Sequence, residues 1–180
     1  MKKILLICFL IIINGYAVGQ NVSVLDQKNG FKTLKFGTVR ADIKDLKFLK
    51  TEYGVSYYLL EPQTLDLYYV FEVHFHKIIL GFKNDKLMLI ALSKTENFND
   101  PSSSNVLIED LKYLHHSFCK TIGESEYIKE DSGDIYHRWY GETCKLSLSR
   151  IRGKGGIDGE GNPFIDVTLQ VIFNSYIEVS

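Results

Sequence analysis

Alternating polar and apolar residues run through much of the chain, and this pattern predicts strands. Between Leu65 and Val73 every second residue is apolar, which is the period of a strand that buries one face. The same alternation returns between Ile165 and Phe173. Residues 83–86 separate two apolar runs with an Asn-Asp pair, a combination that favours a tight hairpin turn. The pattern therefore predicts antiparallel strands joined by short turns.

Two segments instead show helical spacing of their apolar residues. Three apolar residues recur at this spacing within 38–49 and predict a short helix. A longer stripe predicts a helix over 107–122, with Ser103 or Ser104 as its N-cap and Gly123 as its end. The apolar members of the longer stripe are Leu107, Leu111, Leu114, Phe118 and Ile122.

The order helix, then strands, occurs twice along the chain. A polar segment at 99–104, with Pro101 and three serines, separates a first half at 20–98 from a second half at 99–180. We therefore expect an α+β fold, an antiparallel sheet packed on one face by helices. The two halves form either one compact unit or a tandem duplication of a helix-plus-three-or-four-strand unit.

The first nineteen residues have the order of a secretory signal peptide. A basic start at residues 1–3 precedes an apolar run from Ile4 to Ile13, and small residues follow up to Gly19. The apolar run is shorter than the roughly 20 residues that a membrane-spanning helix needs. We expect cleavage near Gln20 and a periplasmic or secreted protein, with an uncleaved membrane anchor as the alternative.

Charge and composition narrow the classes of partner. Cleavage would remove two lysines and shift the formal net charge from −1 to about −3. Such a small negative charge gives no support to a nucleic-acid partner or to binding of anionic lipid. An apolar content of 45 % is that of a folded globular protein. We expect no nucleic-acid partner, and no membrane span once the signal is removed.

Two cysteines, Cys119 and Cys144, would remain after cleavage. Cys119 lies beside the stripe of the longer helix, and Cys144 falls on the apolar face of a strand. In an oxidising compartment an even number of cysteines favours pairing, so we predict a disulfide between them. It would stabilise the fold by about 3 kcal/mol. The alternative is two buried free thiols that pack as small apolar side chains.

The second face of the first-half strands carries apolar residues where the second-half strands carry polar ones. We expect an exposed apolar patch centred on Tyr68, Val70, Ile79 and Ile90, and a surface of this kind is typical of protein-binding sites. The alternative is that the other half of the chain, or residues 21–36, covers this face.

A glycine-rich segment, Gly153–Pro163, predicts a long hairpin tip that could bind a partner. Asp158, Glu160 and Asn162 occupy alternate positions there, as oxygen ligands do in calcium loops. A proline and a leucine stand at two later positions of the calcium-loop pattern, so we expect no calcium site.

His74 and His76 form a further pair with side chains on one side of the chain. Two histidines supply only half of a zinc site, and no residue nearby completes the spacing. We therefore expect exposed histidines, and neither a metal nor a cofactor.

Short motifs suggest one family resemblance. Phe36-Gly37-Thr38 followed by Ile43 resembles the opening of small exported proteins of the BamE and β-lactamase-inhibitor-protein type. The hairpin at 82–87 fits the end of the sheet in these proteins, and residues 114–123 resemble the helix of a second copy. The resemblance implies a sheet-and-helix module that binds other proteins, and it implies no catalytic residue.

Catalysis finds little support in the sequence. There is no G-x-S-x-G motif, and the carboxylates are scattered along the chain. We expect no enzymatic activity and no catalytic residues. The sequence favours an exported module that binds another envelope or extracellular protein. The alternatives are a binder of a small apolar ligand held between helix and sheet, and a hydrolase with an unrecognised site.

Overall fold

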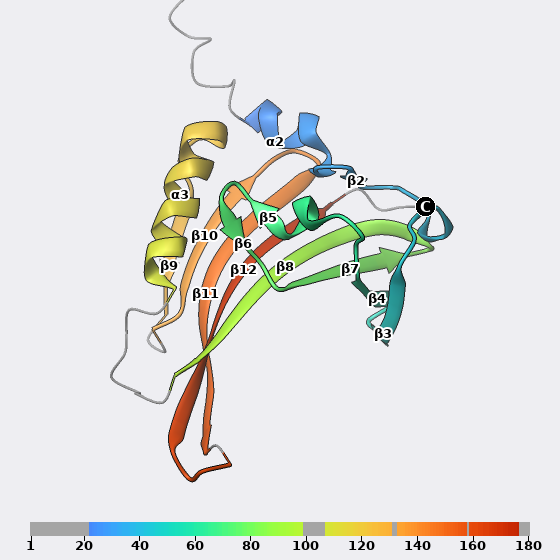
Figure 1. Cartoon of the computed structure of the whole chain (residues 1–180). Helices are drawn as coiled ribbons and strands as arrows, with labels where there is room; N and C mark the ends of the chain where they lie inside the picture. Colours follow the sequence, from blue (N-terminus) through green and yellow to red (C-terminus); the bar gives the residue numbers. More distant parts are fainter. Residues whose placement is uncertain (1–21, 99–106, 131–132, 158, 177–180) are drawn as a thin grey trace, which may run out of the picture.

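The computed structural model describes residues 22–98, 107–130, 133–157 and 159–176. The predicted signal peptide at 1–19 and the boundary segment at 99–104 lie outside these residues. An eight-stranded antiparallel sheet forms the body of the molecule (Figure 1). Its strands, in spatial order, are β3 (Leu46–Glu52), β4 (Val55–Leu60), β7 (Lys77–Lys83), β8 (Lys86–Phe98), β12 (Pro163–Ser175), β11 (Cys144–Ile157), β10 (Ile135–Tyr140) and β9 (Glu126–Lys129).

Shorter elements pack against one side of this curved sheet, which we call the inner face. They are the helices α2 (Val22–Lys28) and α3 (Ile108–Ile122), the 3₁₀ turn η2 (Leu65–Tyr68), and the hairpins β1 (Gly30–Phe31) with β2 (Leu34–Lys35) and β5 (Tyr69–Val70) with β6 (Val73–His74). A further 3₁₀ turn, η1 (Arg40–Asp42), lies beside the β7–β8 turn, where the Arg40 N–H donates to the Asp85 carbonyl at 2.8 Å. Figure 1 also shows the far part of the β11–β12 hairpin extending away from the rest of the molecule.

The expected α+β fold with helices covering the sheet is wrong, because the described chain is mainly β and has only two α-helices, of 7 and 15 residues. The helix predicted over 38–49 is instead the turn η1 followed by edge strand β3. Asp45 has a left-handed φ of 59°, which ends any helical run at that point. Neither of the two helices is long and apolar enough to cross a membrane.

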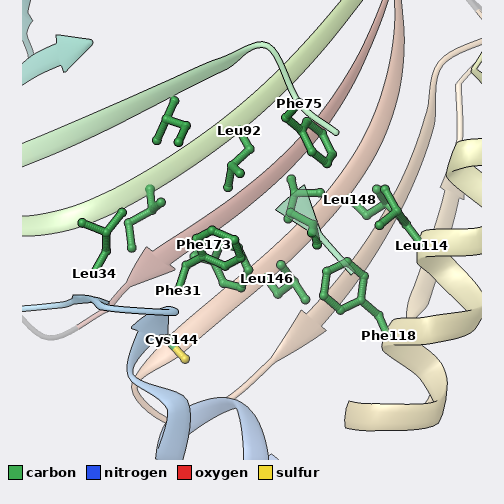
Figure 2. Packing of buried hydrophobic residues seen from close by; sticks show 14 of the residues in the cluster. Phe31, Leu34, Phe75, Leu92, Leu114, Phe118, Cys144, Leu146, Leu148 and Phe173 are labelled. Atoms are coloured by element: carbon green, nitrogen blue, oxygen red, sulfur yellow. The ribbon is translucent and has the colours of Figure 1, made fainter. Parts of the chain in front are cut away.

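The core consists of rows of side chains that cross the sheet on its inner face. Register aligns Leu80 with Ile90, Ile90 with Phe173, Phe173 with Leu146, and Leu146 with Trp139. All five residues are buried. Figure 2 shows Leu114 and Phe118 of α3 and Phe31 of β1 on the same face of the sheet as Leu146 and Phe173. Burial of this apolar row across both halves of the chain joins them into one sheet.

The longer helix occurs where the sequence predicts it, but its start differs. Helix α3 begins at Ile108, and its N-cap is Leu107 in a left-handed conformation without a side-chain cap hydrogen bond. The two serines predicted as caps, Ser103 and Ser104, lie outside the described residues. Gly123 ends the helix as predicted.

Each half of the chain contributes four neighbouring strands to the sheet, and β8 of the first half pairs with β12 of the second at the centre. Strands β7 and β11 each lie next to this central pair. Helix α3, however, precedes β9 along the chain, whereas the 3₁₀ turn η1 precedes the corresponding edge strand β3. The duplication itself stays a prediction.

Candidate functional site

The four residues of the predicted apolar patch do not come together on one surface. Ile79 lies on the face of the sheet opposite the core, which we call the outer face, and is half-buried. Ile90 and Val70 are buried in the core, and Tyr68 packs against the core from η2. Only Ile79 is thus placed as the prediction requires.

Two local irregularities explain this difference. A bulge opposite Gly81 makes Phe82 pair with Leu87 and Gly81 with Leu89, which turns Ile90 toward the core. The segment predicted as one strand over 65–73 is a 3₁₀ turn followed by the small β5–β6 hairpin. In that hairpin Val70 faces inward although the alternation placed it outside.

The predicted disulfide between Cys119 and Cys144 is wrong, because both cysteines are free. The Cys119 Sγ lies 3.2 Å from His115 Nε2, within α3. Cys144 is buried at the start of β11, where its thiol donates to the Leu25 carbonyl of α2 at 3.5 Å. Both thiols are free, as in the alternative, but only Cys144 is buried, Cys119 is half-buried, and each thiol has its own polar partner.

The glycine-rich segment gives no metal site in the part that the structure describes. Glu160 and Asn162 lie between β11 and β12, both exposed, whereas Asp158 lies outside the described residues. The His74 and His76 side chains are exposed, and their rings lie 5.7 Å apart. Among all the described residues, no group of three or more histidines, cysteines or carboxylates is arranged to hold a metal ion.

An apolar pocket of about 320 Å³, which we call the aromatic pocket, opens between the helices and the sheet. Its walls come from α2, β1, the β5–β6 hairpin, the last turns of α3 and strand β12. Four phenylalanines line it. The ring of Phe71 meets Phe118 edge-on at 5.1 Å between centroids, and Phe31 lies 5.4 Å from Phe173. Figure 2 shows Phe118 pointing from α3 toward the sheet, with Phe31 beside Phe173.

Helix α2 forms one wall of the pocket and is fixed by the carboxylate of Asp26. This carboxylate accepts hydrogen bonds from the backbone N–H groups of Glu142 and Thr143, each at 2.9 Å, and from the Thr143 hydroxyl at 2.6 Å. A Cβ at Gly141 would lie 2.5 Å from an Asp26 oxygen, so a larger residue there would displace this carboxylate. Burial raises the pKa of Asp26, but the hydrogen bonds outweigh it and lower the pKa below its ordinary value.

Two tight turns contribute other parts of the pocket wall. Gly30 has a φ of 132°, and a Cβ there would lie 2.1 Å from the Leu34 carbonyl oxygen, so the β1–β2 hairpin needs glycine. Phe71 has a left-handed φ of 52° and is 44 % exposed. An aromatic residue in this conformation is unusual, and the Phe71 ring packs against Phe118 in the pocket wall.

His115 of α3 and His137 of β10 lie in contact and join these two elements, and we call them the histidine pair. The rings of His115 and His137 stack with centroids 3.9 Å apart. The Ser125 hydroxyl lies 3.1 Å from His115 Nε2 and 3.1 Å from His137 Nδ1, so it bridges the two rings. The Tyr127 ring lies 5.2 Å from His137, and Trp139 donates its Nε1–H to the Gly123 carbonyl at 2.7 Å.

Electrostatics favour the uncharged state of this network. Burial, with a smaller effect from His115, lowers the pKa of His137 to about 4. Burial also lowers the pKa of His115, with Glu124 acting in the opposite direction and His116 in the same one. Burial and then Glu124 raise the pKa of the Cys119 thiol. A cysteine nucleophile must be a thiolate, whereas these effects keep the Cys119 thiol protonated and the His115 imidazole neutral.

Sequence reasoning missed both the aromatic pocket and the histidine pair. His115 and Cys119 stand four residues apart on a helix, a spacing that places two side chains on one face. This spacing could have predicted the contact of His115 with Cys119. The strand register that brings His137 beside α3 could not be predicted from the local sequence. The pocket has no local signal, because its walls come from five separate segments.

The fold and the aromatic pocket together define a mainly β protein with one curved antiparallel sheet and an apolar recess on its inner face. No protein-family model, curated protein or solved structure matches the chain. The resemblance to BamE-type proteins stays a prediction.

Proposed function

We propose that the protein binds a small apolar ligand in the aromatic pocket. The observation that carries this proposal is the pocket itself, which is lined mostly by apolar side chains and lies between helices and sheet. Its volume of about 320 Å³ falls at the lower end of the range of about 300–1,000 Å³ that is usual for ligand sites. Four aromatic rings offer a large contact area to an apolar guest.

A second recess is larger but less suited to an apolar ligand. It measures about 420 Å³ and lies among loops that carry Asp42, Lys44 and Asp45. Desolvating these charged groups would oppose the burial of an apolar molecule. The aromatic pocket is therefore the better site for such a ligand.

The test uses N-phenyl-1-naphthylamine, a neutral probe that fluoresces in apolar surroundings. We expect saturable binding with one site per chain. Phe71→Asn should weaken this binding about tenfold, because it removes one aromatic wall. Asparagine tolerates the left-handed backbone of this position, so the hairpin itself should persist.

Tyr53→Asn is the matched control. Tyr53 has a φ of 50° and is 95 % exposed, outside the pocket, so the same replacement there changes the backbone in the same way. Its probe affinity should equal that of the wild type, and circular dichroism should show the same strand content in all three proteins. Absence of saturable binding, or equal weakening by both variants, would contradict the proposed function.

Protein binding through the outer face is a second candidate function. Register places Leu59, Ile79, Ala91 and Ile172 in one row across four strands, and all four are half-buried. An apolar row of this kind suits an interface with another protein. Ile79→Lys should abolish capture of a partner while leaving probe binding in the aromatic pocket intact, which separates the two functions.

A further inference from the structure

The aromatic pocket has charged residues of only one sign along its described lining. Lys28 at the end of α2 and Lys32 in the β1–β2 turn both line the pocket, and no carboxylate among the described residues does so. The pocket thus combines an apolar interior with basic side chains at its edge. This arrangement matches a molecule that is apolar along its length and acidic at one end.

Three acceptors near Lys28 and Lys32, one main-chain carbonyl and two carboxylates, already have partners of their own. The main-chain carbonyl of Lys28, at the end of α2, accepts a hydrogen bond from Lys35 Nζ at 2.8 Å. Asp66 pairs with Lys32 at 2.9 Å. Asp26 faces the β10–β11 turn, where three donors bind its carboxylate. The Lys28 ammonium therefore adds positive charge that these groups do not neutralise.

The size of the pocket limits the apolar part of the ligand. A volume of about 320 Å³ accommodates one short chain and leaves no room for a lipid with two chains. We infer that the pocket takes a single-chain amphiphile with a carboxylate head, with its chain among Phe31, Phe71 and Phe118 and its head at Lys28. This inference rests on the proposed function and adds the class of ligand.

The experiment measures displacement of N-phenyl-1-naphthylamine by three competitors of equal chain length: decanoate, decanol and decyltrimethylammonium. We expect decanoate to bind about fivefold tighter than decanol, the gain of a partly exposed ion pair, and the cation to bind weakest. The advantage of decanoate over decanol should shrink at high salt, since the Lys28 side chain is exposed. Between octanoate and decanoate, affinity should rise about fourfold per methylene.

Variants of Lys28 locate the head group. Lys28→Gln should remove the advantage of decanoate and leave decanol unchanged, while Lys28→Arg should keep the advantage. Lys47→Gln, on edge strand β3 away from the pocket, is the control for total charge and should behave as wild type.

The outcomes separate the two proposals. Equal affinity for decanoate and decanol, or an unchanged preference in Lys28→Gln, would overturn the acidic head group and leave an apolar pocket in place. Failure of the probe itself to bind would overturn the proposed function as well.

Discussion

At the scale of single residues, one carboxylate decides where the first helix lies. Asp26 reaches across 117 positions of the chain to the backbone N–H of Thr143, and it also binds the Glu142 amide and the Thr143 hydroxyl. Removal of an anion that satisfies several donors leaves them unpaired, so Asp26→Ala should lower the free energy of unfolding by about 1–3 kcal/mol. Chemical denaturation at neutral pH measures the change.

The same residue predicts a direction of pH dependence. The pKa of Asp26 is lower in the folded protein than its ordinary value of 3.8, so the folded state favours the charged form. Its contribution to stability is complete above the unfolded pKa and is lost as the pH falls through the folded pKa. Asp42→Ala, at an exposed carboxylate of η1, is the control, and an equal loss of stability in both variants would contradict a specific role for Asp26.

At the scale of elements, the histidine pair makes the contact of α3 with β10 sensitive to acid. His137 is 8 % exposed, and its pKa is lowered from 6.5 to about 4 on folding. A base with a lowered folded pKa binds fewer protons when folded. The contribution of neutral His137 to the free energy of unfolding is therefore complete above pH 6.5 and is lost as the pH falls toward 4. The loss at pH 4 should reach about 3 kcal/mol.

Denaturation curves between pH 4 and pH 7 test this expectation. His137→Phe keeps an aromatic ring against His115 but removes the titrating group, so stability should depend less steeply on pH. His76→Phe changes an exposed histidine outside the contact and should keep the wild-type dependence. A His137→Phe protein with the full wild-type pH dependence would show that the acid sensitivity arises elsewhere.

Helix α3 and strand β12 show where the sequence pattern was sufficient to predict an element. The stripe of α3 and the alternation of β12 each agree with the structure, because each reports one face packed against a large core. The 65–73 segment has an equally regular alternation, yet Phe71 adopts a left-handed φ and reverses the chain into a hairpin. Tertiary packing of Val70 and Val73 overrides the local pattern there.

At the scale of the whole molecule, the sequence predicted antiparallel strands in both halves but not how they assemble. The strand order depends on β8 pairing with β12, and these segments share no local signal. The candidate site depends on the same assembly, because α2, α3 and the β5–β6 hairpin meet only over the completed sheet. The local sequence pattern predicts the single strands, but it does not contain the long-range register that pairs them.

The central β8–β12 pair predicts that the two halves unfold together. Leu169 of β12 is fully buried and lies opposite Lys94 of β8 and Arg150 of β11. Leu169→Ala should lower the free energy of unfolding by about 2–5 kcal/mol, as for other buried leucines.

Fluorescence of the single tryptophan, Trp139 in β10, reports the second half, and far-ultraviolet circular dichroism reports all strands. If one sheet joins both halves, the two signals should shift to lower urea concentration by the same amount and stay coincident. Leu65→Ala, at a leucine that is 72 % exposed, should change stability by less than about 0.5 kcal/mol. Two separate transitions, with only the tryptophan signal shifted by Leu169→Ala, would instead describe two halves that fold independently.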